Sequence, residues 1–268
     1  INFDVSAGLP AGTLGSKTVS RNGYNEEDLM DYVAQSAKAD IALHYKPFGD
    51  DLEIIYNGKF GKGNTIYQGS SRYAIDNFFM QQHKLEIRDD SFFARVYVTS
   101  EDAGDSYDSR FAAINLNRSW KGDTQWFTEY ARAYIGGRLG MIPGLPALDD
   151  ATASSVARQA AQTGALVAGT PEFKAAMDAV TSNPDLTTGA KFQDKTKLYH
   201  GDVNYNFHKL VDFADIQVGG SWRRYSLNSS GTIFTDYDGA INYEEFGAYT
   251  QIQKKYLDDR LKFTGSLR

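Results

Sequence analysis

A carboxylate-rich segment in the last part of the chain has the spacing of half a calcium-binding loop. Asp236, Asp238 and Glu245 would stand at positions 3, 5 and 12 of such a loop, with Gly239 at the turning position 6. Phe234 would stand at position 1, where it cannot bind a metal ion, and the flanking residues alternate as strands do. We therefore favour an Asp-Gly turn between two strands. A weak structural calcium site in this loop is the alternative hypothesis.

No other pattern of catalytic or metal-binding residues stands out. The four histidines, His44, His83, His200 and His208, fall on separate predicted strands or turns without the spacing of a metal site. The chain has no cysteine, which excludes disulfides and a thiolate nucleophile. A formal net charge of -6 argues against nucleic acid as a partner, because phosphate binding needs clustered Lys and Arg. We predict that the protein is not an enzyme, with no catalytic residue and no cofactor apart from the hypothetical calcium ion.

Four aromatic or charged residues in the middle of the chain are our candidates for ligand contact: Trp120, Trp126, Tyr130 and Arg132. Trp126 and Tyr130 recur at helical spacing, so we predict a short amphipathic helix over 124–135. Such an aromatic stripe has two interpretations. It can pack a folded segment against its own protein, which is the more common role, or it can face a ligand or a partner, as long loops often do.

Capping residues predict two more helices in the same segment. Asp149 or Asp150 would cap an Ala-rich helix that runs toward Gly164. The Thr-Pro pair at 170–171 begins another helix, and the Asn-Pro pair at 183–184 ends it.

Outside this segment, the chain alternates apolar and polar residues one for one, which is the period of a β-strand. The alternating runs form four pairs joined by short polar turns, the first of which contains Gly49, Asp50 and Asp51. With Ile1 to Ala7 as an opening strand, we predict about nine strands. The paired runs are 39–45 with 52–60, 79–87 with 92–99, 199–207 with 216–222, and 246–252 with 261–267.

The connections between these runs differ strongly in length. Turns of about four or five residues alternate with loops of roughly 18 to 95, which is typical of outer-membrane β-barrels with short periplasmic turns and long extracellular loops. Aromatic residues near strand ends suit the interfacial girdle of such a barrel. These aromatic residues are Tyr45, Tyr56, Phe60, Phe92, Phe207, Trp222 and Phe246. A soluble sandwich is the alternative, but it rarely keeps all its short turns at one end. No apolar run approaches the ~20 residues of a membrane-spanning helix.

The strand segments resemble the barrel of TonB-dependent receptors, especially those of the Bacteroidetes type. The resemblance covers nearly the whole chain as a run of strands and loops, and it is carried by residues 77–108, 199–207 (YHGDVNYNF), 216–231 (IQVGGSWRRYSLNSSG) and 243–268. It implies a plugged outer-membrane barrel that imports a scarce ligand, such as a siderophore, a glycan or a peptide, with energy from the TonB complex. The plug domain of the family is not in this sequence. Such barrels have about 22 strands, so nine would be only a part of one.

We therefore predict an all-β fold: an antiparallel up-and-down transmembrane β-barrel fragment of about nine strands with a long, partly helical extracellular loop. Residues 1–100 and 194–268 would form barrel strands, and residues 101–193 the loop insertion with short helices. The resemblance implies a bacterial outer-membrane location. The implied partners are outer-membrane lipid, the TonB complex acting through the missing plug, the imported ligand and a surface lipoprotein.

Two other classes of protein fit the same alternation. A passive outer-membrane porin would lack a plug, so a plug-like domain elsewhere in the full protein distinguishes the two. A soluble or surface-attached all-β binding module would stay in solution without detergent. The identity of the ligand does not follow from the strands, because related barrels carry different ligands with different loops and plugs.

Overall fold

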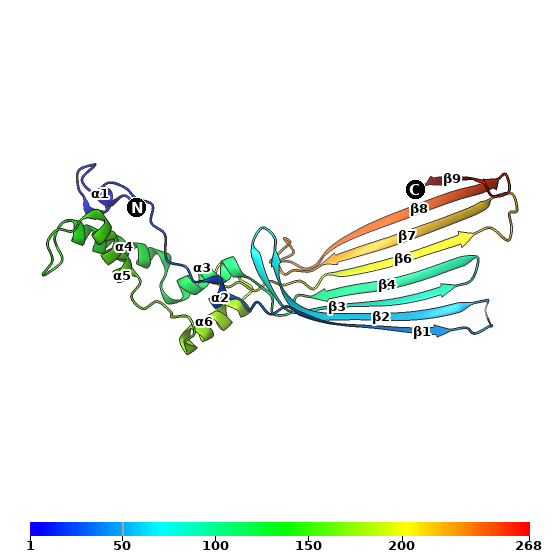
Figure 1. Ribbon diagram of the computed structural model, residues 1–268, viewed down its shortest axis with the longest axis horizontal. Helices are drawn as coiled ribbons and strands as arrows, with labels where there is room; N and C mark the ends of the chain where they lie inside the picture. Colours follow the sequence, from blue (N-terminus) through cyan, green and yellow to red (C-terminus); the bar gives the residue numbers. More distant parts are fainter. Residues whose placement is uncertain (50) are drawn as a thin grey trace. The chain divides into compact units, whose positions relative to one another are not determined.

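A computed structural model gives the structure of the protein (Figure 1) and describes residues 1–49 and 51–268. Asp50, which we placed in the first turn, lies outside the described residues. The chain forms two compact units, which we call the sheet unit and the helical unit. The sheet unit comprises residues 32–107 and 191–268, and the helical unit comprises residues 1–31 and 108–190.

The beginning of the chain differs from the prediction. We expected a strand from Ile1 to Ala7, but residues Phe3–Ala7 form helix α1. The reason is local: the side chain of Asn2 accepts a hydrogen bond from the backbone N–H of Val5, and Gly8 ends the helix in the left-handed conformation at φ 65°. The prediction of an opening strand is therefore wrong, and this segment belongs to the helical unit.

The sheet unit is one antiparallel sheet (Figure 1). Its eight long strands lie in the order β1-β2-β3-β4-β6-β7-β8-β9, and the short strand β5 pairs with β3. The predicted β-rich fold and all four predicted hairpins are confirmed. The total of nine strands agrees with the prediction in number only, because the unpredicted β5 takes the place of the expected opening strand. The sheet is open, with β1 and β9 at its edges. The strands are β1 (Gln35–Tyr45), β2 (Glu53–Gln68), β3 (Arg72–Arg88), β4 (Phe92–Asp102), β5 (Tyr107–Asp108), β6 (Lys197–Asn206), β7 (Asp215–Leu227), β8 (Ile241–Tyr256) and β9 (Leu261–Leu267).

The connection between β2 and β3 is much shorter than predicted. We expected a loop of roughly 18 residues, as in a long extracellular connection, but the two strands continue and pair as far as Gln68 and Arg72. A β-bulge between Gly63 and Thr65 shifts their register. A bulge adds an unpaired residue, so the period-two pattern breaks although the strand continues. The sequence pattern therefore ended the strand too early.

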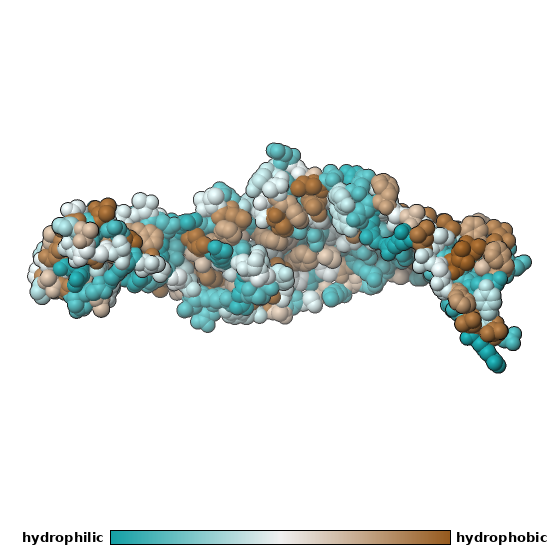
Figure 2. Space-filling view, turned by 90° about the horizontal axis from the view of Figure 1, so that it is seen from above, coloured by the Kyte–Doolittle hydropathy of each residue, from teal (hydrophilic) through white to brown (hydrophobic). Residues whose placement is uncertain are grey.

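The register gives the sheet two faces of opposite character. One row of paired residues crosses seven strands, and we call it the central row: Leu43, Tyr56, Leu85, Val96, Gly201, Trp222 and Phe246. The face that carries this row is the apolar face, and many of its side chains are exposed; Leu43 is 64% exposed and Phe246 is 78% exposed. Figure 2 shows hydrophobic residues in brown at the molecular surface. The other face, the polar face, carries most of the charged side chains of the strands, whereas those of the apolar face lie near the strand ends.

Six helices of the described residues form the helical unit. The three predicted helices are confirmed as α4, α5 and α6, with Asp149 and Thr170 as the side-chain caps of α5 and α6. Helices α2 and α3 were not predicted. The described residues include no helix with the length and apolar character needed to cross a membrane. Besides α1, the helices are α2 (Glu26–Leu29), α3 (Ser109–Trp120), α4 (Asp123–Arg138), α5 (Asp150–Ala161) and α6 (Pro171–Ser182).

Candidate functional site

Charged side chains cross the polar face from β1 to β8 in two chains of ion pairs and hydrogen bonds. We call them together the charged ladder: His44, Glu53, Arg88, Glu86 and Lys84 in the first chain, and Arg95, Asp202, His200, Arg223 and Glu245 in the second. Alternation places these residues on the polar face of their strands, and pairing brings the strands together. Glu86 of the first chain is opposite Arg95 of the second in the register, so the ladder is continuous across β3 and β4.

The first chain is built around two carboxylates. Glu53 accepts from Arg88, whose Nη2 lies 2.7 Å from Glu53 Oε2, and the Nδ1 of His44 lies 2.7 Å from Glu53 Oε1. Glu86 is only 7% exposed, and Lys84 Nζ lies 2.9 Å from its Oε2. A buried carboxylate is stable only when it is paired or hydrogen-bonded, so these partners are needed for the fold of this face.

The second chain contacts a buried histidine at both ring nitrogens. Arg223 donates through Nε to His200 Nδ1 at 3.1 Å, so Nδ1 is an acceptor and the ring proton is on Nε2. This nitrogen lies 3.3 Å from Asp202 Oδ1, which also accepts from Arg95 Nε at 2.7 Å. The ring of Tyr97 stacks on the imidazole at a centroid distance of 4.8 Å. The ladder is therefore a row of donors and acceptors that pair with one another across the polar face.

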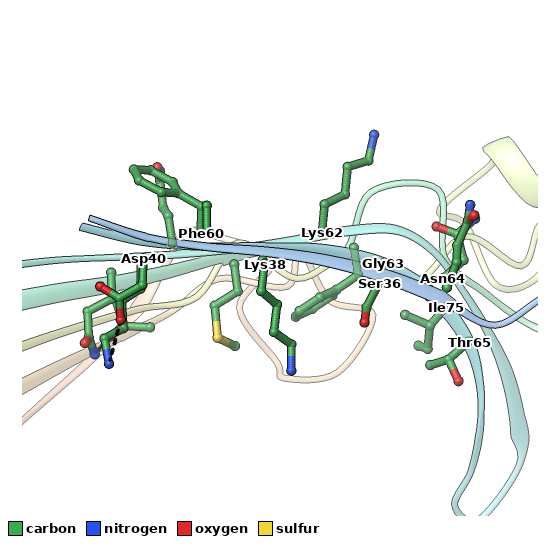
Figure 3. A pocket seen from close by; sticks show the side chains of 18 residues that line it. Ser36, Lys38, Asp40, Phe60, Lys62, Gly63, Asn64, Thr65 and Ile75 are labelled. Carbon is green, nitrogen blue, oxygen red and sulfur yellow. Dashed lines mark hydrogen bonds and ion pairs between the residues drawn. The ribbon is translucent and has the colours of Figure 1, made fainter. Parts of the chain in front are cut away.

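A pocket of about 700 Å³ opens beside the strands where β1, β2 and β3 meet (Figure 3). In this view, Lys38 and Asp40 point to one side of the strands, whereas Phe60 and Lys62 point to the other side. Three lysines, Lys38, Lys59 and Lys62, and the carboxylate of Asp40 line the pocket, with Lys62 on the other side of the strands from Lys38 and Asp40. Lys59 Nζ lies 3.5 Å from Asp40 Oδ2, so one cation is paired and the lining can accept an additional anionic or hydroxylated group.

The four candidates for ligand contact lie in the helical unit, in different surroundings. Trp126 and Tyr130 are 0% and 3% exposed and stack on one another at a centroid distance of 5.6 Å. They belong to the core of the unit, with Phe3 and the alanines of α5. Trp120 is partly buried under the guanidinium of Arg21, and Arg132 is exposed. The structure therefore brings Trp126 and Tyr130 together as packing residues, and of the four only Arg132 is fully open to a ligand.

The calcium candidates are also separated by the fold. Asp236 is 4% exposed, and its carboxylate accepts from Ser229 Oγ at 2.7 Å and from the backbone N–H groups of Ser230 at 3.0 Å and Gly231 at 2.8 Å. Burial raises the pKa of Asp236, but these hydrogen bonds lower it by more, so its pKa lies well below the usual range. The carboxylate is therefore already used to hold the β7–β8 loop.

The other two calcium candidates lie apart from that carboxylate network. Asp238 is exposed in the same loop, where the N–H of Gly239 donates to the carbonyl of Asp236 at 3.2 Å and forms the predicted turn. Glu245 lies in β8, with its carboxylate 3.8 Å from Arg223. Within residues 1–49 and 51–268, no three His, Asp or Glu side chains are grouped to hold a metal ion. The calcium site stays a prediction.

Sequence reasoning missed the charged ladder as a unit and the contribution of the first residues. Arg21 donates to the carbonyl groups of Asn117 and Lys121 and to Asp123, which joins the N-terminal segment to α3 and α4. A signal for α1 was present, because an Asn followed six residues later by a Gly is a pattern of a short capped helix. No comparable signal exists for the ladder, whose members are far apart in the chain.

Comparisons of the chain with protein-family models, with curated proteins and with solved structures found no match.

Proposed function

We propose that the sheet unit is part of the wall of a bacterial outer-membrane β-barrel. Its apolar face would contact lipid and its polar face would line the aqueous interior. The observation that carries this proposal is the path of the apolar residues across the sheet, which is oblique to the strands.

Both borders of the apolar face shift in the same direction. On the side of the long loops, we count along the apolar face of each strand from the central row to the first polar residue. This residue is Lys62 in β2, six residues from the row. It is Lys197 in β6, four residues from the row, and Glu244 in β8, two residues from the row. On the side of the short turns, the last apolar residue lies two residues away in β3 (Ile87) and six in β8 (Ile252). The apolar residues therefore form an inclined band of nearly constant width. Strand β3 departs from it at His83, whose Nδ1 lies 2.8 Å from Tyr56 Oη.

The inclination of this band agrees with the geometry of a barrel. The first border moves four residues over five strand-to-strand steps. At about 3.4 Å per residue and about 4.8 Å between strands, this is an angle of about 30°. Strands of outer-membrane barrels are tilted by roughly 35–45° from the membrane normal, which makes a horizontal lipid layer cross them obliquely. A flat soluble sheet has no reason to carry such an inclined band.

The length of the band also suits a bilayer. Glu244 and Lys254 are the polar residues that border the band in β8, and they enclose nine residues. A tilted strand needs roughly 9–11 residues to cross a membrane. In the proposed barrel, further strands pair with the free edges of β1 and β9, and the long β4–β6 connection is extracellular.

Active transport is the second part of the proposal, and the resemblance to TonB-dependent receptors supports it. The full protein would take up a scarce ligand, such as a siderophore, a glycan or a peptide, and the TonB complex would move a plug to admit it. A passive porin is the competing function. Planar-bilayer conductance of the full-length protein separates them, because a plugged transporter passes little ion current and a porin passes a steady current.

Single-cysteine spin labels test the membrane position directly, because the chain has no native cysteine. Labels would replace Val96 and Val203 on the apolar face, and Thr99 and Ser221 on the polar face, in the full-length protein reconstituted in vesicles. We expect labels at Val96 and Val203 to collide with oxygen, which concentrates in lipid. Labels at Thr99 and Ser221 should collide with a water-soluble nickel chelate. If the chelate reaches all four labels equally, the sheet is in water and the proposal fails.

A further inference from the structure

The apolar face has a groove over strands β4, β6 and β7. Two adjoining hollows of about 620 and 480 Å³ share the residues Ala94, Val203 and Gly220. Gly201 lies at the other end of the first hollow, beside Val96 and Trp222. We call this the glycine groove, because Gly201 and Gly220 form its floor where neighbouring rows carry large side chains.

Crowding does not explain these two glycines. A Cβ at Gly201 would lie 3.5 Å from Val96 Cγ1, and a Cβ at Gly220 would lie 3.6 Å from the carbonyl oxygen of Gly247, both ordinary contacts. Neither residue has a positive φ. Glycine in the interior of a strand often marks a bulge, a tight bend or a place where another molecule approaches closely. The strands pair without a register shift at Gly201 and Gly220, so there is no bulge at either residue. The groove therefore indicates an occupant.

Cationic side chains lie at the loop end of the groove, on the same face. Arg224 follows Trp222 by two residues on β7, and Lys197 precedes Gly201 by four residues on β6. Lys197 is exposed and has no ion pair among the described residues. Arg224 Nε lies 3.9 Å from Glu244 Oε1, so two cations face one carboxylate and leave one net positive charge.

We propose that the glycine groove binds an acyl chain of an anionic phospholipid, with the lipid phosphate on Arg224 and Lys197. The proposal rests on the proposed membrane position of the sheet. The apolar hollow fits a hydrocarbon chain, and the guanidinium and ammonium groups at its end fit a phosphate, to which Arg can donate two parallel hydrogen bonds. Cationic side chains of a membrane protein that lie near the lipid headgroups attract anionic lipids in this way. The site is a specific lipid site in the proposed barrel wall.

Quenching of Trp222 fluorescence by brominated acyl chains tests the proposal. The full-length protein would be reconstituted in phosphatidylcholine vesicles with brominated phosphatidylglycerol or, at the same mole fraction, brominated phosphatidylcholine. The fluorescence of Trp222 is obtained by subtracting the fluorescence of the Trp222→Phe variant from that of the parent protein. We expect phosphatidylglycerol to associate with the groove about fivefold more strongly than phosphatidylcholine does, because the groove has one net positive charge near the lipid headgroup. Equal association of the two lipids would overturn the proposal.

Matched variants assign this preference to the groove. Lys197→Ala with Arg224→Ala should abolish the preference, whereas Lys62→Ala, which removes a cation from the same face on β2, should leave it unchanged. Gly201→Leu with Gly220→Leu should fill the groove and reduce quenching by both lipids. Gly265→Leu is the control for bulk on the same face, since a Cβ there meets open space.

The outcomes separate this proposal from the previous one. If Lys62→Ala lowers the preference as much as the Lys197 and Arg224 pair, general surface charge accounts for it and the site is refuted. If both brominated lipids quench Trp222 equally in every variant, the sheet is in the bilayer but has no lipid site. If neither lipid quenches Trp222, the apolar face is not in lipid and the proposed membrane position fails as well.

Discussion

The helical unit buries its aromatic core, whereas the sheet unit exposes many of its large apolar side chains. In the helical unit, Trp126 and Tyr134 are 0% and 1% exposed, as in any water-soluble core. In the sheet unit, Val96 of the central row is 57% exposed, whereas Glu86 and His200 of the charged ladder are each 7% exposed. The apolar core of the helical unit is already shielded from water. The apolar face of the sheet unit is shielded from water only if an apolar medium covers it. The contrast is what the proposed membrane position of the sheet unit requires.

The size of the exposed face strengthens this contrast. Soluble monomers rarely expose continuous apolar patches larger than a few hundred Å². Here the central row and its neighbouring rows cross seven strands. The helical unit has its own aromatic core and needs no partner to bury it. The sheet needs a cover, and in the proposed barrel lipid is that cover.

The largest expected effect tests the core of the helical unit. Trp126→Ala removes a fully buried indole that stacks on Tyr130 and meets Phe127 edge to face, and we expect it to lower the free energy of unfolding by about 3–5 kcal/mol. Urea denaturation followed by helical circular dichroism measures this loss. Arg132→Ala on the same helix is the control and should change stability by less than about 0.5 kcal/mol. Equal effects of the two changes would place Trp126 outside a packed core, where a role in ligand contact would again be open.

The next effect compares two exposed valines, one in each unit. Val96 in β4 and Val5 in α1 are 57% and 76% exposed. In vesicles, Val96→Arg should destabilise the sheet by about 2–4 kcal/mol, because the charge lies near the middle of the bilayer. Val5→Arg faces water and should change stability by less than about 0.5 kcal/mol. Reversible denaturant unfolding in the presence of lipid gives both values. If Val96→Arg is as harmless as Val5→Arg, the apolar face is in water and the contrast between the units disappears.

The sequence predicts the sheet better than the helical unit, for a physical reason. Strand hairpins depend on alternation and on adjacent turn residues, which are both local, so the pairing of β3 with β4 follows directly from the sequence around Arg88 to Phe92. Where a bulge at Gly63 broke the alternation, the prediction failed. The local caps of α1, Asn2 and Gly8, were visible in the sequence, but the packing of Phe3 against Tyr134 of α4 was not, because Tyr134 is distant in the sequence.

The candidate site depended even more on distant pairing. Arg95 and Asp202 are 107 residues apart, and only the pairing of β4 with β6 joins them. Alternation identified both as polar-face residues, but not as partners. The sequence pattern identified the aromatic stripe of α4, but it was compatible with two roles, ligand contact and packing. Burial of Trp126 and Tyr130 favours packing, and such burial depends on α5, whose alanines allow close approach.

The smallest expected effect concerns acid stability of the helical unit. Asp4 accepts hydrogen bonds from the backbone N–H groups of Leu14 at 2.6 Å, Gly12 at 2.8 Å and Gly15 at 3.2 Å. The bond from Leu14 has the largest effect and lowers the pKa of Asp4, burial raises it, and the bonds from Gly12 and Gly15 lower it further. The net pKa is below its ordinary value, so the unfolded chain binds a proton at a higher pH than the folded chain does.

The lowered pKa of Asp4 determines the pH range in which this carboxylate stabilises the helical unit. The stabilisation by Asp4 is fully present above the unfolded pKa of about 3.9 and is lost as the pH falls through the lower folded pKa. We therefore expect Asp4→Asn to lower the Tm of the helical unit at pH 7. The Tm difference between the variant and the parent should be smaller at about pH 3, as measured by circular dichroism. A Tm difference that is the same at pH 7 and pH 3 would show that side-chain shape, and not the carboxylate charge, holds Gly12 to Gly15 against α1.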